Sequence, residues 1–258
     1  MRLRLRMKNG IKKEEFQAPK QPTIRRVHER LKEHYGSRKV TKRDPLDGLV
    51  LIILSQATND INCDRAFTSL KTKFPTWKAV LNAPVEEIAD AIRSGGLANQ
   101  KAARIKQLLQ EMHDETGTLD LSWMHEADAE QCREYLQKFH GVGPKTIACV
   151  LVFFLDKPAF PVDTHVHRVT KRLGWIRPQA GAEEAHKVLE AAVPDEYKLD
   201  LHVNLISHGR FICRAPGNGG PKCSECFLKT LCAYGKTIKG KSTPSEPTTR
   251  SDFFVTVE

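Results

Sequence analysis

The sequence predicts an all-α fold. Apolar residues recur at helical spacing along most of its 258 residues, and no segment shows the strict apolar–polar alternation of a half-buried strand. Steps such as Asp44-Pro45 and Gly95-Gly96 mark where the apolar runs start or stop. A chain of this length can bury a large core in one or two domains.

The first helix is expected at Thr23–Tyr35, where Ile24, Val27 and Leu31 fall on one face. A nearly uninterrupted apolar run predicts a buried helix at Leu46–Ala57. The same spacing predicts further helices at Asp60–Lys71, Trp77–Asn82, Val85–Arg93, Asn99–Glu115, Glu130–Phe139, Ile147–Leu155, Thr164–Leu173, Ala182–Ala192 and Leu199–Ile212. The helix at 147–155 is almost wholly apolar, which indicates burial, and it is too short to span a bilayer.

The two ends of the chain differ from this pattern. Residues 1–20 are strongly basic and are expected to form a disordered arm, and residues 235–258 are polar and are expected to form a disordered tail. The apolar residues 253–255 leave open whether the tail docks. No apolar secretory segment or membrane-spanning run is present in the sequence, so we expect a cytoplasmic protein, associated with the nucleoid if bacterial or archaeal.

The net charge of +10 favours a polyanionic partner, although a solvated basic surface would have the same composition. Seven cysteines without a secretory signal indicate a reducing compartment. Cys63, Cys132 and Cys149 fall on apolar helix faces and are expected to be packed thiols.

A glycine-rich turn at residues 140–145, His-Gly-Val-Gly-Pro-Lys, precedes the apolar helix. Gly141 and Gly143 let a ligand backbone approach closely, and the N–H groups at the following helix start can bind an anion. Lys145 lies on that first turn, and Asp163 follows eighteen residues later at the next helix start. An ordinary helix start and an ordinary N-cap are the alternative interpretation.

Four cysteines near the end of the chain have the spacing C-x9-C-x2-C-x5-C: Cys213, Cys223, Cys226 and Cys232. Thiolates at such spacing bind zinc or an iron–sulfur cluster. Structural zinc usually shows two C-x2-C pairs, and only one is present here. The spacing therefore favours a cluster over zinc, with unligated cysteines as a third alternative.

The turn Gly141-Val142-Gly143-Pro144-Lys145-Thr146 and the segment Val162-Asp163-Thr164-His165 resemble the helix-hairpin-helix DNA glycosylases, and among them the endonuclease III family. The resemblance covers about residues 23–234. It implies two lobes with a DNA-binding cleft between them. A six-helix lobe would span 44–156, and residues 21–43 with 157–234 would form the other lobe.

The resemblance also implies a function. A monomer would bind damaged duplex DNA and release oxidised pyrimidines, with Lys145 attacking the sugar C1′ to form a Schiff base and cut the strand by β-elimination. Asp163 would orient or deprotonate the attacking group and stabilise the sugar cation. An adenine glycosylase of the same fold is an alternative that Lys145 disfavours. A non-catalytic DNA-binding cluster protein is another, but it would need no Lys145–Asp163 pair.

Further site residues follow from the same resemblance. Gln56 would fill the space of the flipped base and Leu97 would enter the opposite strand. The alternatives are a buried helix amide for Gln56 and a packed loop leucine for Leu97. The sequence register after Gln56 differs by one residue from that of the family. The remaining expected DNA contacts are His140, Gly141, Gly143, Lys145 and His165, with His167 as a surface or phosphate contact.

For the four cysteines the resemblance implies a [4Fe–4S] cluster as cofactor. The family spacing is C-x6-C-x2-C-x5-C, so the first interval is three residues longer in this chain. The insertion should form a bulging loop, and its ends, Arg214 and Lys222, keep the basic charge that contacts DNA phosphates in the family. We expect the cluster to be structural, because it would cross-link a segment with little core of its own.

Overall fold

The computed structural model describes residues 16–243 and 256–257, and these are mostly helical. The all-α prediction is confirmed. The helices are α1 (Gln21–Tyr35), α2 (Pro45–Leu54), α3 (Asp60–Lys73), α4 (Trp77–Asn82), α5 (Val85–Ala91), α6 (Ala98–Thr116), α7 (Ala129–Leu136), α8 (Pro144–Phe154), α9 (Thr164–Leu173), α10 (Ala182–Ala192), α11 (Lys198–Phe211) and α12 (Ala233–Thr237). Short 3-10 turns connect several of them, including η1 (Arg93–Gly95) and η4 (Pro216–Asn218).

Polar side chains at the helix starts fix these boundaries. Asp44, Asn59 and Thr76 each accept a hydrogen bond from a backbone N–H in the first turn of α2, α3 and α4. Asp128 begins α7 with a complete capping box formed with Gln131. These side chains satisfy N–H groups that a helix start would otherwise leave without a partner.

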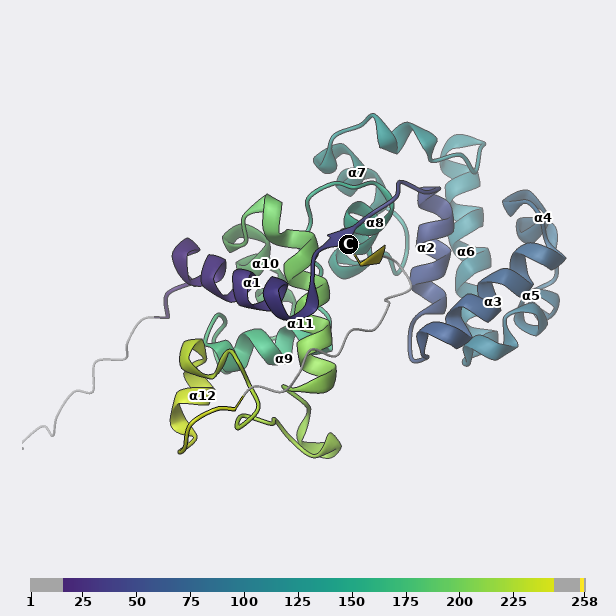
Figure 1. Cartoon of the computed structure of the whole chain (residues 1–258). Coiled ribbons are helices and arrows are strands. Elements are labelled where there is room, and N and C mark those ends of the chain that lie inside the picture. The colour runs from purple at the N-terminus through teal and green to yellow at the C-terminus, as the bar shows by residue number, and fades with distance from the viewer. Residues whose placement is uncertain (1–15, 244–255, 258) are drawn as a thin grey trace, which may run out of the picture.

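The helices form two hydrophobic cores. In Figure 1, the helices α2–α8 of the first core lie toward the right and top, and α1 with α9–α12 of the second core lie toward the left and bottom. The first core collects buried residues from positions 46–159 together with Val203. The second core collects residues from positions 24–35 and 160–232. The helix α1 thus packs with the second half of the chain, against α11.

The helix α8 lies inside the first core and packs against α2. Its residues from Thr146 to Phe154 are all buried, as the apolar sequence predicted. The contact is close: a Cβ built on Gly48 of α2 would lie 2.6 Å from the Phe154 ring. The start of α8, which carries Lys145, is therefore held by a tightly packed helix pair.

The prediction for the end of the chain needs correction. Residues 233–237 form α12, and residues 256–257 form a strand, β2 (Thr256–Val257), antiparallel to β1 (Arg38–Lys39). The polar composition gave no indication of this pairing, because two-residue strands form by backbone hydrogen bonds between distant segments. Residues 1–15 and 244–255, including the apolar residues 253–255, lie outside the described part of the chain. Within that part, no helix is both long and apolar enough to cross a membrane.

Candidate nucleic-acid interface and active site

The glycine-rich turn lies between α7 and α8 and faces solvent. Gly141 has φ 73°, a left-handed conformation that favours glycine. Gly143 precedes α8 without any side-chain cap, so the first N–H groups of this helix have no side-chain acceptor. His140, Gly141, Gly143 and Lys145 are all exposed, which gives a surface suited to an anionic backbone.

Asp163 begins α9, and its Oδ1 accepts a hydrogen bond from the Val166 backbone N–H at 2.7 Å. This geometry confirms that Asp163 is an N-cap, as the alternative interpretation proposed. The cap uses one carboxylate oxygen and holds the carboxylate at the helix start. A capping role and a chemical role are thus compatible in this residue.

Lys145 and Asp163 lie around the same two buried groups, Cys149 and His202. Burial raises the pKa of the Cys149 thiol, Lys145 opposes that rise, and Asp163 adds to it. Burial lowers the pKa of His202 to about 4, with Asp163 opposing and Lys145 adding to the change. The Lys145 amine and the Asp163 carboxylate, eighteen residues apart in sequence, therefore both act on the pKa of the same two buried groups.

His202 was not identified from the sequence. Its Nδ1 lies 2.8 Å from the carbonyl oxygen of Pro161, two residues before Asp163. The ring also contacts the aromatic rings of Phe153 and Phe160. A carbonyl only accepts hydrogen bonds, so Nδ1 carries the hydrogen and donates it. This hydrogen bond from the neutral ring connects α11 to the segment that carries Asp163.

Gln56 and Leu97 are both exposed, which excludes the alternatives of a buried amide and a packed leucine. Gln56 follows the end of α2, and the next residue, Ala57, has φ 52°. The helix therefore ends earlier than the predicted Ala57. Leu97 is 53% exposed and has φ 49°, a conformation unfavourable for a residue with a Cβ atom. An exposed leucine held in this way is not explained by packing.

The two histidines after Asp163 have different roles. His165 is partly buried, and its Nδ1 accepts a hydrogen bond from Arg168 at 3.1 Å. Burial lowers the pKa of His165, and the nearby Asp163 carboxylate opposes this. His167 Nε2 lies 2.9 Å from the Ala180 carbonyl oxygen, to which it donates. His167 is half-buried and its ring joins α9 to the segment before α10, and a contact of His167 with phosphate stays a prediction.

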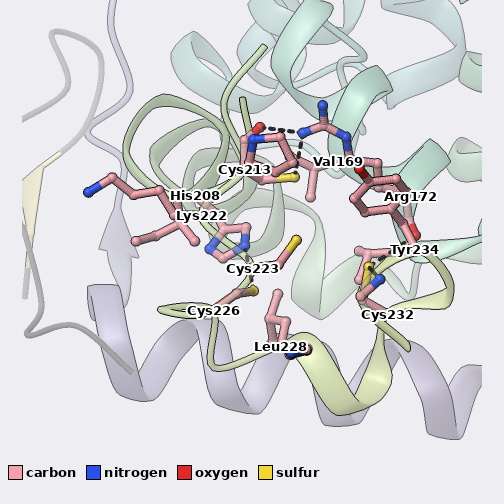
Figure 2. Close-up of a pocket in the computed structure, with 15 residues that line it drawn as sticks. Val169, Arg172, His208, Cys213, Lys222, Cys223, Cys226, Leu228, Cys232 and Tyr234 are labelled. Carbon is pink, nitrogen blue, oxygen red and sulfur yellow. Dashed lines mark hydrogen bonds between the residues drawn. The ribbon is translucent and has the colours of Figure 1, made fainter. Parts of the chain in front are cut away.

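The four C-terminal cysteines line one pocket, shown in Figure 2. Arg172 donates to Cys213 Sγ at 3.2 Å, and the Gly235 N–H donates to Cys232 Sγ at 3.3 Å. His208 Nε2 lies 3.5 Å from Cys226 Sγ. These polar groups can stabilise thiolate charge in an otherwise buried place.

The thiols of this pocket are neutral unless a cation binds. Burial raises the pKa of Cys226 to about 12 and also raises the pKa of Cys223 and Cys232, so these thiols need a cation to ionise at neutral pH. Among the described residues, no three His, Cys, Asp or Glu side chains converge on one ion position. The four thiols therefore line the walls of the pocket without meeting at one point.

The insertion between Cys213 and Cys223 forms a turn containing η4, and an isolated bridge between Cys213 and Pro221 joins its ends. Lys222 Nζ donates to Glu225 at 3.1 Å. The Arg214 carbonyl oxygen accepts a hydrogen bond from Arg172. The charge of Lys222 is thus partly neutralised, and the contacts of Arg214 and Lys222 with DNA stay predictions.

Two arginines of α9 were missed in the sequence. Arg168 and Arg172 both donate to the carbonyl oxygen of Cys213, at 3.0 and 3.1 Å, and Arg168 also donates to Gly209. Their spacing of one helical turn was the available signal, because it places both on one face. They join the helix that Asp163 caps to the first cysteine.

Comparison with known proteins identifies the family. Residues 50–195 match the model of the HhH-GPD superfamily base excision DNA repair protein. A putative DNA glycosylase of Arabidopsis thaliana, At3g47830, is 47% identical over 168 residues, which are 65% of this chain and 57% of that protein. The chain therefore spans little more than half the length of this relative. Endonuclease III of Thermotoga maritima is 34% identical over 191 residues, covering 74% of this chain and 84% of its own.

Solved structures agree with this result. A trapped covalent endonuclease III–DNA intermediate has a TM-score of 0.69 and 30% identity, covering 84% of this chain and 97% of its own. A non-covalent endonuclease III–DNA complex gives a TM-score of 0.69 at 31% identity, covering 84% of this chain and 96% of its own. The chain belongs to the HhH-GPD superfamily of base excision DNA repair proteins and, within it, to the endonuclease III family.

Proposed function

We propose that this protein is a bifunctional DNA N-glycosylase and AP lyase that acts on oxidised pyrimidines in duplex DNA as a monomer. The observation that carries the proposal is the Lys145–Asp163 pair around Cys149 and His202. Phosphate binding by the hairpin requires neither residue. The relative DNA glycosylase/AP lyase ROS1 of Arabidopsis thaliana, 33% identical over 199 residues, supports the lyase activity.

Lys145 would supply the nucleophile. Its neutral amine attacks C1′, the glycosidic bond breaks, and the base leaves with the bonding electrons and takes up a proton. In the resulting aminal the C1′–O4′ bond breaks and O4′ takes the proton that the attacking nitrogen loses, which gives a Schiff base. The protonated Schiff base loses a proton from C2′, and the C3′–O bond then breaks to release the phosphate. Lys145 is exposed in the free protein, so water reaches its side chain. Bound DNA would have to exclude the water.

Asp163 would stabilise the positive charge that develops on the sugar as the base leaves. Its capping bond to Val166 keeps the carboxylate at the start of α9. Asparagine caps helices about as well as aspartate, so Asp163→Asn removes the charge with little change of structure. This substitution therefore separates the chemical role of Asp163 from its structural role.

We further propose a [4Fe–4S] cluster held by Cys213, Cys223, Cys226 and Cys232, in a lobe formed by residues 21–43 and 157–234. The four thiols line one pocket. When bound, such a cluster supplies covalent cross-links among four thiolates. The bonds from Arg168 and Arg172 to Cys213 would transmit this rigidity to α9.

Borohydride trapping on a duplex that contains thymine glycol tests the enzymatic proposal. We expect a covalent adduct whose modified peptide contains Lys145. Lys145→Gln should abolish the adduct, because no amine remains to form the imine, whereas Lys78→Gln, which changes an exposed lysine on α4, should not. Asp163→Asn should slow base release by about 10²–10³-fold.

A preformed abasic site separates the two steps. Asp163→Asn should retain more lyase activity on this substrate than glycosylase activity, since no base has to leave. Trapping at the wild-type rate by Lys145→Gln would show that another amine is the nucleophile. Activity only on adenine opposite an oxidised guanine would instead assign a different substrate class.

A further inference from the structure

Two cations in the first half of α6 bond to three loops that carry proposed DNA contacts. Lys101 and Arg104 are three residues apart and therefore neighbours on the helix surface. Lys101 is only 4% exposed, although lysine is almost never fully buried without partners. Arg104 is partly exposed. Neither residue belongs to the catalytic pair.

Lys101 joins two loops with a single amine. Its Nζ donates to the carbonyl oxygens of Leu54 and Gly95, each at 2.7 Å. Leu54 is the last residue of α2, two positions before Gln56, and Gly95 lies two positions before Leu97. Carbonyl groups at a helix end attract a cation. Lys101 therefore fixes the spacing between the Gln56 loop and the Leu97 loop.

Arg104 joins the Gln56 loop to the hairpin. One guanidinium nitrogen donates to Gln56 Oε1 at 3.2 Å, and the other donates to the Gly141 carbonyl oxygen. A Cβ built on Gly141 would lie 3.0 Å from this guanidinium, so the arginine rests directly on the turn. A second residue of α6 also contacts the hairpin turn: Glu111 accepts a hydrogen bond from the His140 N–H at 2.8 Å.

We propose that Lys101 and Arg104 are positioning residues that couple the Gln56 loop, the Leu97 loop and the hairpin into one unit. In the free protein Arg104 holds the Gln56 side chain against the hairpin. Entry of Gln56 into the duplex breaks that bond and leaves the guanidinium beside the hairpin, where it can meet a phosphate. This inference rests on the proposed function for the role of Gln56, but the coupling itself exists without DNA.

Hydrogen–deuterium exchange of the free protein tests the coupling directly. Arg104→Met should increase amide exchange at residues 55–58 and 140–143, because both loops lose a shared partner. Lys101→Met should increase exchange at 55–58 and 95–98. Lys78→Met, which removes an exposed lysine from α4, is the matched control and should change neither. Unchanged exchange in Arg104→Met would overturn the proposal.

Lys101 is buried, so thermal unfolding must accompany these measurements. If Lys101→Met fails to fold, Arg104→Met decides the question alone, since Arg104 is partly exposed. Arg104→Lys keeps the charge but lacks the planar fork that reaches two acceptors at once. It should therefore loosen the loops as Arg104→Met does. Exchange at the wild-type level in Arg104→Lys would show that charge alone matters and would overturn the coupling.

Kinetics then test the consequence for DNA. Arg104→Met and Arg104→Lys should slow single-turnover base release about tenfold or more, because a displaced positioning group misaligns the reacting atoms. Cleavage of a preformed abasic site should change less. Arg104→Met and Gln56→Ala should be non-additive in a double-mutant cycle. Additive effects would overturn the role assigned to the Arg104–Gln56 bond.

Failure of the proposed function is distinguishable from failure of this inference. If wild-type protein neither releases a base nor cleaves an abasic site, the enzymatic proposal is wrong. The exchange measurements on the free protein still decide whether Lys101 and Arg104 couple the three loops.

Discussion

The two hydrophobic cores are built differently. The first is formed by residues 46–159 together with Val203, and its buried side chains are almost all hydrocarbon or thiol groups. The second brings α1 together with the chain after residue 159 and contains Cys213, Cys226 and Cys232 among its members. Hydrophobic burial can hold the first core by itself. In the second core, those three cysteines line one pocket together with Cys223.

The two cores also contribute different parts of the site. The first carries Gln56, Leu97, the hairpin and Lys145, whereas the second carries Asp163. The helix α11 belongs to both, because Val203 packs in the first core and Leu201 packs in the second. His202 lies between these two residues and bonds to Pro161. The relative position of Lys145 and Asp163 is thus set by a helix that the two cores share.

Cysteine removal should give the largest difference between the cores. We expect Cys226→Ser to lose bound iron, visible absorbance and the cooperative unfolding of the second core, while the first core still unfolds cooperatively. Iron analysis of anaerobically purified protein and calorimetry would measure both effects. Cys132→Ala removes a buried thiol of the first core and should keep the iron. Zinc without iron in the wild type would contradict the cluster.

A substitution that adds a methyl group at the contact between α2 and α8 tests how tightly the first core is packed. Gly48→Ala places a methyl group 2.6 Å from the Phe154 ring, so we expect a loss of roughly 2–3 kcal/mol in the free energy of unfolding. Denaturant unfolding measures this loss. Gly217→Ala, at a position with no heavy atom within 4 Å of the added methyl, is the control and should change little. Equal stability of the two variants would show that α2 and α8 are not tightly packed.

The free energy of unfolding should depend on pH through His202, which lies on α11, the helix that both cores share. The folded-state pKa of His202 is about 4, below its ordinary value of 6.5, so the unfolded chain binds the proton more readily. The stability from the neutral ring is therefore complete above pH 6.5 and is lost as the pH falls toward 4. The loss should be about 1 kcal/mol per pH unit in this window. His202→Gln should show a shallower decline by denaturant titration, and an unchanged slope would contradict the buried neutral ring.

Most of the helices could be predicted from the sequence, because apolar periodicity and capping residues act over a few neighbouring positions. The ends of the predicted helices agree with the structure to within three residues. For example, Ala57 was predicted to lie in a helix, but its left-handed backbone lies beyond the end of α2. The Lys145 and Asp163 positions and the four cysteines were also identifiable, since each lies in a short motif with its own chemistry.

The sequence by itself therefore determined the helices, the hairpin turn and the candidate nucleophile, carboxylate and thiols. Only the tertiary structure decided that His202 bonds to Pro161, two residues before Asp163, that His167 bonds to Ala180, and that Lys101 and Arg104 join three loops. The physical reason is that each of these contacts links segments brought together by packing, at sequence separations from 6 to 48 residues. Local helix propensity does not indicate which distant carbonyl group will accept a hydrogen bond from a buried donor. That partner depends on how the two cores pack around the donor.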